Sequence, residues 1–262
     1  MTSDIPQRAA DLLRHHRERQ TRIEALPAPL RPKTRENGYA IQQWIETESE
    51  APLFGWKIAA TSLAGQAHVD VDGPLVGRIL TEQRLFAGDA YAIGKNHMRV
   101  GELEFAFRFR RDIPPVRPAW TVTDAIAEVE ALHIAIEVPD SRYERYDRVG
   151  APQLIADNAC AHRFLLGPEA SVDWRLLDLS AHTVIGLVDD VTVETGSGGN
   201  VLGDPRRALA WFLEEQARFD VTVRKGQIVT TGTCVQPIML RPDTILTGDF
   251  GVLGQVSLRI AR

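Results

Sequence analysis

The chain has 262 residues, of which 44% are hydrophobic and 25% are charged, a composition typical of one large globular domain with or without a smaller N-terminal elaboration. Its net charge of −5 and its scattered Lys and Arg residues argue against a protein that binds nucleic acid or an anionic membrane. Cys160 and Cys234 lack paired-ligand spacing, which argues against a zinc site and favours a reducing compartment.

The N-terminal part of the chain is expected to be mainly helical over residues 1–70. It has no continuous apolar stretch of the signal-peptide type, and no run approaches the ~20 apolar residues of a membrane span, so we expect a soluble cytoplasmic protein. Ser3 or Asp4 can cap a first helix that has Pro6 in its first turn. The prolines of 26–32 end this helix, and a second amphipathic stretch follows over 34–48.

From Gly55 onward the pattern changes to short strands separated by turns. Strands are expected over 55–61, 73–80 and 84–93, with glycines between them, and then over 99–109. A proline-rich loop follows the last of these.

In the middle of the chain, Thr123 is expected to cap a helix over 124–132 that leads directly into a strand over 133–142. The segment 155–167 reads as a helix or turn followed by another strand. Helices and strands therefore mix along the chain without a regular βαβ alternation.

The C-terminal part combines hairpins with one clear helix. A hairpin is expected over 182–200, and its glycine-rich end, 196–200, lacks phosphate-loop spacing and reads as a flexible turn. Asp204 can cap a helix that has Pro205 at its first position, and two hairpin-like runs over 226–240 and 243–260 close the chain. We therefore predict an α+β protein around a bent, mixed sheet, in which 71–262 forms one compact unit with the helical region.

Two acidic residues interrupt the apolar strand at 99–109. Glu102 and Glu104 point to the same face, about 7 Å apart, because strand side chains alternate. A third acid, Glu137, stands at the end of another strand-like run. Three carboxylates on rigid strands suit Mg²⁺ or Mn²⁺, although the spacing alone favours a solvated sheet face, since E-x-E is a common pattern.

Lys57 is the second unusual residue, because it stands between Trp56 and Ile58 in an apolar strand. Its side chain can reach the surface past the apolar residues, or it can lie in a cavity where burial lowers its pKa into the range useful for acid–base catalysis. A serine hydrolase is not indicated, because the sequence has no G-x-S-x-G segment.

Eight segments, in this order along the chain, resemble the 2-keto-4-pentenoate hydratase family within the wider fumarylacetoacetase-like superfamily. They are YAIQ (39–42), GWKIAATS (55–62), GELEFAF (101–107), IEVPDSR (136–142), ADNA (156–159), NVLGDPRRALAWF (200–212), GQIVTTGT (226–233) and GVLGQVSLRI (251–260). A single segment would be weak evidence for the family. The eight segments occur in the same order and span nearly the whole chain.

The resemblance implies a fold, a site and a reaction. The fold is a mixed β-roll of the fumarylacetoacetase C-terminal-like type with flanking helices, commonly assembled into homo-oligomers. The metal, Mg²⁺ or Mn²⁺, is held by Glu102, Glu104 and Glu137, and Lys57 faces the active-site cavity as a catalytic residue. The implied substrate-binding residues are Thr61, Ser62, Asp157 and Thr233.

The reaction that the resemblance implies is hydration of a 2-hydroxy-2,4-dienoate to a 4-hydroxy-2-oxo acid during aromatic catabolism. The chain departs from the family pattern at three places. Leu75 in PLVG (74–77) replaces an acidic residue, Cys160 and Ala161 follow ADNA where some relatives have serines, and GDP (203–205) replaces G-H-P. These departures affect the substrate side chain and the route of proton transfer.

Three other functions remain open from the sequence. A decarboxylase of the 4-oxalocrotonate type would use the same metal, and Arg78 and Arg142 are the candidates for binding the second carboxylate of its substrate. An acylpyruvate hydrolase is less favoured, because the N-terminal region offers no His–Glu pair. The third is a non-catalytic subunit in a complex with a related decarboxylase or hydratase.

Overall fold

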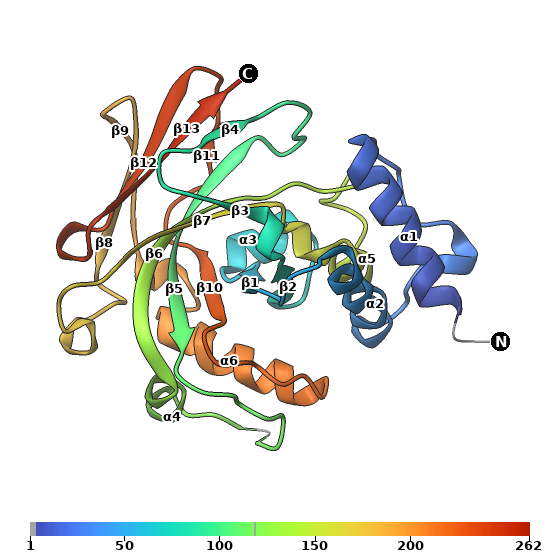
Figure 1. Ribbon diagram of the computed structural model, residues 1–262, viewed down its shortest axis with the longest axis horizontal. Coiled ribbons are helices and arrows are strands. Elements are labelled where there is room, and N and C mark those ends of the chain that lie inside the picture. The colour runs from blue at the N-terminus through green and yellow to red at the C-terminus, as the bar shows by residue number, and fades with distance from the viewer. Residues whose placement is uncertain (1–3, 118) are drawn as a thin grey trace.

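Strands and helices alternate irregularly in the computed structural model, which describes residues 4–117 and 119–262 (Figure 1). The strands are β1 (Gly55–Ala59), β2 (Leu75–Ile79), β3 (Arg84–Leu85), β4 (Ala90–Ala92), β5 (Val100–Phe109), β6 (Val129–Val138), β7 (Arg163–Glu169), β8 (Thr183–Val188), β9 (Val191–Ser197), β10 (Ile228–Thr233), β11 (Ile238–Met239), β12 (Thr244–Asp249) and β13 (Gln255–Ala261). The α-helices are α1 (Asp4–Arg19), α2 (Arg35–Gln42), α3 (Leu63–His68), α4 (Val122–Ala127), α5 (Ala151–Ala156) and α6 (Pro205–Arg218). Short 3₁₀ turns are η1 (Ala28–Leu30), η2 (Gln43–Glu48), η3 (Thr81–Gln83), η4 (Asn158–Cys160), η5 (Trp174–Leu176), η6 (Gly198–Asn200) and η7 (Gly251–Leu253).

The strands form two mixed sheets. The larger, eight-stranded sheet has the order β2-β1-β10-β5-β6-β7-β3, with β11 also paired to β5, and the five-stranded sheet has the order β4-β13-β12-β8-β9. The pairs β1–β10, β3–β7 and β13–β4 are parallel, and the others are antiparallel. In Figure 1, α1, α2 and α5 gather on one side of the larger sheet and the smaller sheet lies on the opposite side. The expected α+β class with curled mixed sheets is confirmed.

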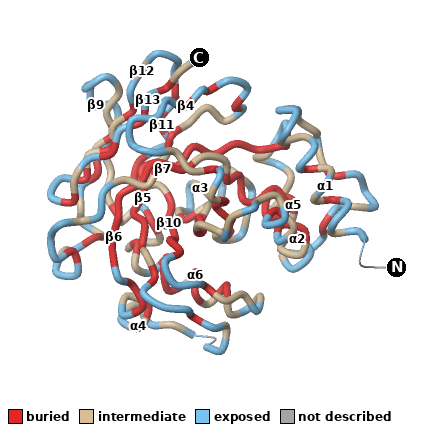
Figure 2. The backbone as a smooth tube through the Cα atoms, viewed as in Figure 1, coloured by how far each residue is buried: buried red, intermediate tan, exposed pale blue. Residues whose placement is uncertain are grey.

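The two longest strands, β5 and β6, form the centre of the molecule. Phe105, Phe107 and Phe109 on one face of β5 are fully buried. Phe105 packs against Phe250, which follows β12 of the smaller sheet, and Phe109 packs against Phe212 of α6. Figure 2 shows that buried residues concentrate in β5, β6 and β10. Side chains on the other face of β5 are therefore held on a rigid, dry support.

The N-terminal helices pack on a smaller cluster of apolar side chains. Ala9 and Leu13 of α1 contact a buried group that includes Leu26 and Tyr143. Thr34 caps α2 by accepting a hydrogen bond from the Asn37 amide, whereas the proposed cap Ser3 lies outside the described residues. β1 pairs with β2 and β10 inside the larger sheet, so the segment before residue 70 contributes a strand as well as helices, and the boundary at 70 stays a prediction.

The expected helix over 124–132 is wrong in both its cap and its length. Thr121, not Thr123, accepts the capping hydrogen bond from the Asp124 amide, and the helix ends at Ala127. The next residues join β6 because Val129 and Leu132 pair with β5 and become buried there. Burial in the sheet outweighs the local helix propensity of this segment.

The hairpin predicted over 226–240 is also wrong. β10 and β11 both pair with β5, through Thr233 opposite Glu104 and Ile238 opposite Gly101. The chain thus continues along the same edge of β5 instead of folding back. The hairpins β8–β9 and β12–β13 are confirmed, as is α6 with its Asp204 cap and Pro205. Among the described residues, no helix is both long enough and apolar enough to cross a membrane.

Candidate active site

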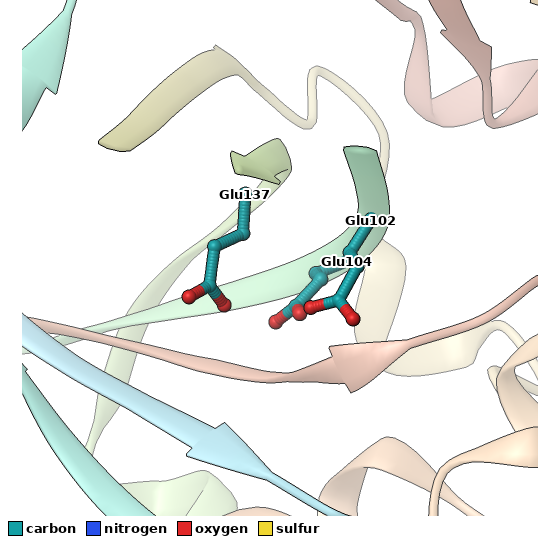
Figure 3. Close-up of side chains that lie close together, drawn as sticks. All are labelled: Glu102, Glu104 and Glu137. Atoms are coloured by element: carbon teal, nitrogen blue, oxygen red, sulfur yellow. The ribbon is translucent and has the colours of Figure 1, made fainter. Parts of the chain in front are cut away.

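Three carboxylates converge where β5 and β6 pair. Glu102 lies directly opposite Glu137 in the antiparallel register, and Glu104 follows two residues further along β5. One oxygen of each carboxylate lies within 4.8 Å of the other two, and Figure 3 shows the three side chains pointing toward one another. Glu104 and Glu137 are 0% and 2% exposed, so the alternative of a solvated sheet face is wrong for these two residues.

This cluster carries more negative charge than the surrounding protein compensates. Glu104 Oε2 accepts a hydrogen bond from the Gly232 amide at 2.9 Å, but Glu104 Oε1 and Glu137 Oε2 are buried and find no donor among the described residues. Burial and the neighbouring carboxylates raise the pKa of Glu104 well above its ordinary value. Burial also raises the pKa of Glu137, and it raises that of Glu102 to about 7. Hard divalent cations favour such a set of oxygens, so the residues fit a metal site.

Lys57 projects from β1 toward this cluster. Its Nζ atom lies 3.0 Å from Glu137 Oε1 and donates a hydrogen bond to the Ala159 carbonyl at 3.0 Å. The residue is 2% exposed, so the expectation that its side chain reaches the surface is wrong. Burial alone would lower the pKa of Lys57, but Glu137, Glu102 and Glu104 outweigh it and raise the pKa. These neighbours favour the charged ammonium, which is the opposite direction to the lowered pKa considered from the sequence. The role of Lys57 in proton transfer stays a prediction.

The carbonyl that holds Lys57 belongs to an unusual backbone turn. Asn158, Ala159 and Cys160 all have positive φ angles, of 58°, 49° and 63°, a conformation that is costly for residues other than glycine. The Asn158 side chain supports the turn by exchanging two hydrogen bonds with the backbone of Arg78, at 2.7 and 2.8 Å. A Cβ at Gly77 would lie 2.5 Å from the Asn158 carbonyl. Sequence reasoning did not identify this role of Asn158, although the residue lies in the ADNA segment.

A cavity of about 520 Å³ opens above the carboxylates. Lys57 and Glu102 line it, together with the predicted substrate-binding residues Thr61, Ser62 and Thr233. Glu104 and Glu137 are not among its lining residues, because they lie beneath it in the sheet. The cavity therefore brings hydroxyl groups, one ammonium group and the edge of the carboxylate cluster into one space.

Asp157 is the predicted substrate-binding residue that the structure does not bring into this cavity. Its Oδ2 atom accepts hydrogen bonds from the Ser141 hydroxyl and the Arg142 amide, both at 2.7 Å. The carboxylate thus fixes the turn that follows β6. A role of Asp157 in substrate binding stays a prediction.

The two arginines considered for a second substrate carboxylate also lie elsewhere. Arg78 pairs through Nε with Glu46 at 2.6 Å, and Arg142 pairs through Nη2 with Asp140 at 2.8 Å. Neither arginine lines the cavity. The expectation that Arg78 or Arg142 binds a distal carboxylate is therefore wrong for this structure.

The glycine-rich segment 196–200 is not a flexible turn. It completes β9 and then forms η6, and a Cβ at Gly198 would lie 2.0 Å from the Leu179 carbonyl. This close approach of two backbone segments requires glycine at position 198. Two residues later, Asn200 lines the cavity and donates a hydrogen bond to the Cys234 carbonyl at 2.7 Å. The segment therefore supports the cavity wall.

The pKa of Glu102 gives the protein a pH-dependent stability when metal is removed. An acid whose pKa is raised by folding contributes stability below its unfolded pKa, and loses that contribution as the pH rises through the folded pKa. In chelator, we expect the melting temperature to fall between pH 5 and pH 8 as Glu102 ionises near pH 7. Excess Mg²⁺ should suppress this fall, and calorimetry at several pH values measures both series. A melting temperature that rises with pH in chelator would contradict the prediction.

Comparison with known proteins places the chain in a family, although no family model matches it. It is 30% identical to 2-keto-4-pentenoate hydratase 2 of Dechloromonas aromatica over 243 residues, covering 89% of this chain and 90% of that protein. It is 27% identical to 2-oxo-hept-4-ene-1,7-dioate hydratase of Escherichia coli, covering 92% of each. The solved structure of 4-oxalocrotonate decarboxylase from Pseudomonas putida G7, complexed with magnesium and adipate, superposes with a TM-score of 0.89 at 25% identity, covering 99% of this chain and 98% of that one.

The curled mixed sheets and the buried acidic cluster define an enzyme of the fumarylacetoacetase-like class. Within that class, the chain belongs to the 2-keto-4-pentenoate hydratase family.

Proposed function

We propose that this protein is a divalent-metal-dependent hydratase that adds water to a 2-hydroxy-2,4-dienoate, such as 2-hydroxypenta-2,4-dienoate, to give a 4-hydroxy-2-oxo acid in aromatic catabolism. The observation that carries the proposal is the cluster of Glu102, Glu104 and Glu137 beneath a cavity that Lys57 enters. The named hydratases among the relatives support it.

The three carboxylates would hold Mg²⁺ or Mn²⁺, and magnesium is the ion named for the solved decarboxylase relative. When bound, such an ion would act as a Lewis acid for the carboxylate and the 2-oxygen of an α-oxo acid, and would stabilise negative charge on the 2-oxygen. The buried oxygens of Glu104 and Glu137, for which the described part of the chain offers no donor, support its placement. The residues of this chain then orient the substrate and transfer protons.

The reaction balances as two proton additions to carbon and one addition of water. The 2-hydroxyl group loses its proton while carbon 5 gains one, which gives a ketone conjugated to the remaining double bond. Water then attacks carbon 4, and carbon 3 takes up a proton. Because the Lys57 ammonium is buried beside the carboxylates, we assign to Nζ the transfer of one of these protons. To Thr61, Ser62 and Thr233 we assign the binding of substrate oxygens, and their position in the cavity lining supports this assignment.

The functional test measures hydration and decarboxylation in parallel. Purified protein with Mg²⁺ is incubated with 2-hydroxypenta-2,4-dienoate and, separately, with 4-oxalocrotonate, while dienol absorbance, 4-hydroxy-2-oxo acid and released carbon dioxide are followed. We expect the first substrate to be hydrated and the second to release no carbon dioxide above the uncatalysed rate. Carbon dioxide release without hydration would replace the proposal with the decarboxylase.

The decarboxylase is the second candidate because of the 0.89 TM-score with 4-oxalocrotonate decarboxylase. It is less favoured because Arg78 and Arg142, the groups considered for its second carboxylate, pair with acids outside the cavity. An acylpyruvate hydrolase would give C–C cleavage products in the same assay. A non-catalytic subunit would bind Mn²⁺ and turn over none of these compounds.

We also propose that the protein is cytoplasmic and forms a homo-oligomer, alone or in a complex with a related decarboxylase or hydratase. The edge strand β9 supports an association because Val191 and Val193 are 65% and 45% exposed on it, and an exposed apolar edge strand favours pairing with another chain. Light scattering of the purified protein measures the oligomeric state directly.

A further inference from the structure

One side of the cavity is a continuous apolar surface, here called the apolar wall. Its members are Val69, Leu75, Met98, Tyr146 and Leu154. All five belong to one apolar cluster, separate from the main core, in which Leu75 and Leu154 are buried and the other three are partly buried against them. Because these side chains pack on one another, the wall is a preformed surface for an apolar group.

The apolar wall begins close to the reacting groups. In the antiparallel pair β1–β2, Lys57 lies opposite Gly77, and Ala59 lies opposite Leu75. Opposed residues share a face of the sheet, and a step of two residues is about 7 Å. Leu75 therefore projects on the same face as Lys57, one such step further along the strands.

The hydroxyl groups of the cavity mark its polar end. A Cβ at Gly232 would lie 1.9 Å from Thr61 Oγ1, and the Gly232 amide donates to Glu104, so Thr61 is next to the carboxylate cluster. A substrate whose carboxylate and 2-oxygen occupy this end would direct its far carbons away from it, toward the apolar wall.

The charges of the cavity oppose a second carboxylate at the far end. Among the described lining residues, Lys57 is the only lysine or arginine, and it already pairs with Glu137. In the described part of the lining, the titratable side chains on that side are His68 and Tyr146, whose ring centroids lie 6.1 Å apart, and Cys160. A carboxylate placed against Leu75 and Leu154 would lose its hydration without gaining a charged partner, which is costly.

We propose that the cavity selects monocarboxylic 2-hydroxy-2,4-dienoates that carry an apolar substituent at carbon 5, and that it rejects dicarboxylic substrates. This inference rests on the proposed function and specifies its substrate class. Leu75 is the specificity-determining residue, because it lines the cavity on the face of the sheet that carries Lys57 and packs in the same apolar cluster as the rest of the apolar wall. The volume of about 520 Å³ lies within the range of pockets for drug-sized ligands and leaves space beyond a five-carbon acid.

The test compares kcat/KM for four dienoates with Mg²⁺ present: the unsubstituted acid, its 5-methyl and 5-propyl derivatives, and 2-hydroxyhepta-2,4-diene-1,7-dioate. We expect kcat/KM to rise by about tenfold or more from the unsubstituted acid to the propyl derivative, since a methylene in an apolar pocket changes kcat/KM by about tenfold or more. The dicarboxylate should fall at least about 100-fold below the propyl derivative. A flat series, or a preference for the dicarboxylate, would overturn the inference.

Variants of Leu75 then test whether this residue determines the preference for the apolar substituent. Leu75→Asp should lower the ratio of kcat/KM for the propyl derivative to that for the unsubstituted acid by about tenfold or more. Leu75→Ala should lower the same ratio, and it keeps the test valid if the aspartate variant does not fold. Leu176→Ala is the matched control, because Leu176 is 83% exposed and outside the cavity. An unchanged ratio in folded Leu75→Ala would contradict the assignment.

Binding of unreactive acids separates this inference from the proposed function. Calorimetry with Mg²⁺ present compares 2-oxoheptanoate with 2-oxoadipate, which share the α-oxo acid group and differ at the far end. Tighter binding of 2-oxoheptanoate, by about tenfold or more, supports the apolar wall even if no dienoate is hydrated. Tighter binding of 2-oxoadipate overturns the inference even if hydration is observed.

Discussion

The Glu104→Gln variant is expected to lose hydration activity, with kcat/KM falling at least about 100-fold. Losing a residue that only supports a metal ligand typically lowers activity by about 10-fold to 100-fold. Because Glu104 is itself one of the three proposed ligands, its loss should cost at least the upper end of this range. Glutamine keeps the size and one oxygen but removes the charge. Titration with Mn²⁺ in a calorimeter should show a parallel loss of affinity.

The same substitution is expected to stabilise the metal-free protein. Burial and the neighbouring carboxylates raise the pKa of Glu104 well above its ordinary value. Near neutral pH, Glu104 therefore lowers the stability of the metal-free fold, either as a charge repelled by its neighbours or because it must take up a proton on folding. A neutral glutamine removes this repulsion, and the melting temperature in chelator should rise at pH 8. Glu130→Gln, which removes an exposed acid from β6, is the control. It should change neither the hydration activity nor the melting temperature in chelator. Full activity in Glu104→Gln would rule out the proposed metal site.

The alternation of strand residues was enough to predict that Glu102 and Glu104 share a face. It could not place Glu137 beside them, because that depends on the β5–β6 register, which no local pattern encodes. The sequence indicated Glu137 as a third acid at a strand end, and the resemblance implied that it joins the other two as a metal ligand. The hydrogen bond between Lys57 and the Ala159 carbonyl was also not predicted. It depends on three consecutive residues with positive φ angles, and the local sequence does not predict this conformation.

The sequence predicted correctly the features that depend on neighbouring residues, and it failed where a feature depends on contacts between distant segments. The cap and the start of α6 are local, and Asp204 and Pro205 predicted them. The end of α4 is not local, since pairing with β5 draws Val129 into a strand. The directions of Arg78 and Arg142 depend on the acids that attract them, Glu46 and Asp140, and these partners lie in segments whose positions only the fold determines.

The Lys57→Met variant is expected to lower kcat at saturating substrate by about 100-fold to 10,000-fold, the usual contribution of a positioned proton donor or acceptor. Methionine preserves much of the apolar stem that packs in β1 but cannot carry a proton. Lys33→Met, which replaces an exposed lysine in a loop, should retain full activity. Unchanged turnover in Lys57→Met would remove Lys57 from the mechanism.

Metal affinity distinguishes a lost proton carrier from a damaged site. Lys57 Nζ lies 3.0 Å from Glu137 Oε1, so its charge competes with a cation for the same carboxylate. Loss of the Lys57 charge also raises the pKa values of the three acids further, so the comparison is made at alkaline pH. There, the ionised acids lack this competitor, and Mn²⁺ should bind more tightly while turnover falls. Because a distorted site would lose both properties, opposite changes in affinity and kcat identify Lys57 as a group that acts on protons, whereas a joint loss would assign it a structural role.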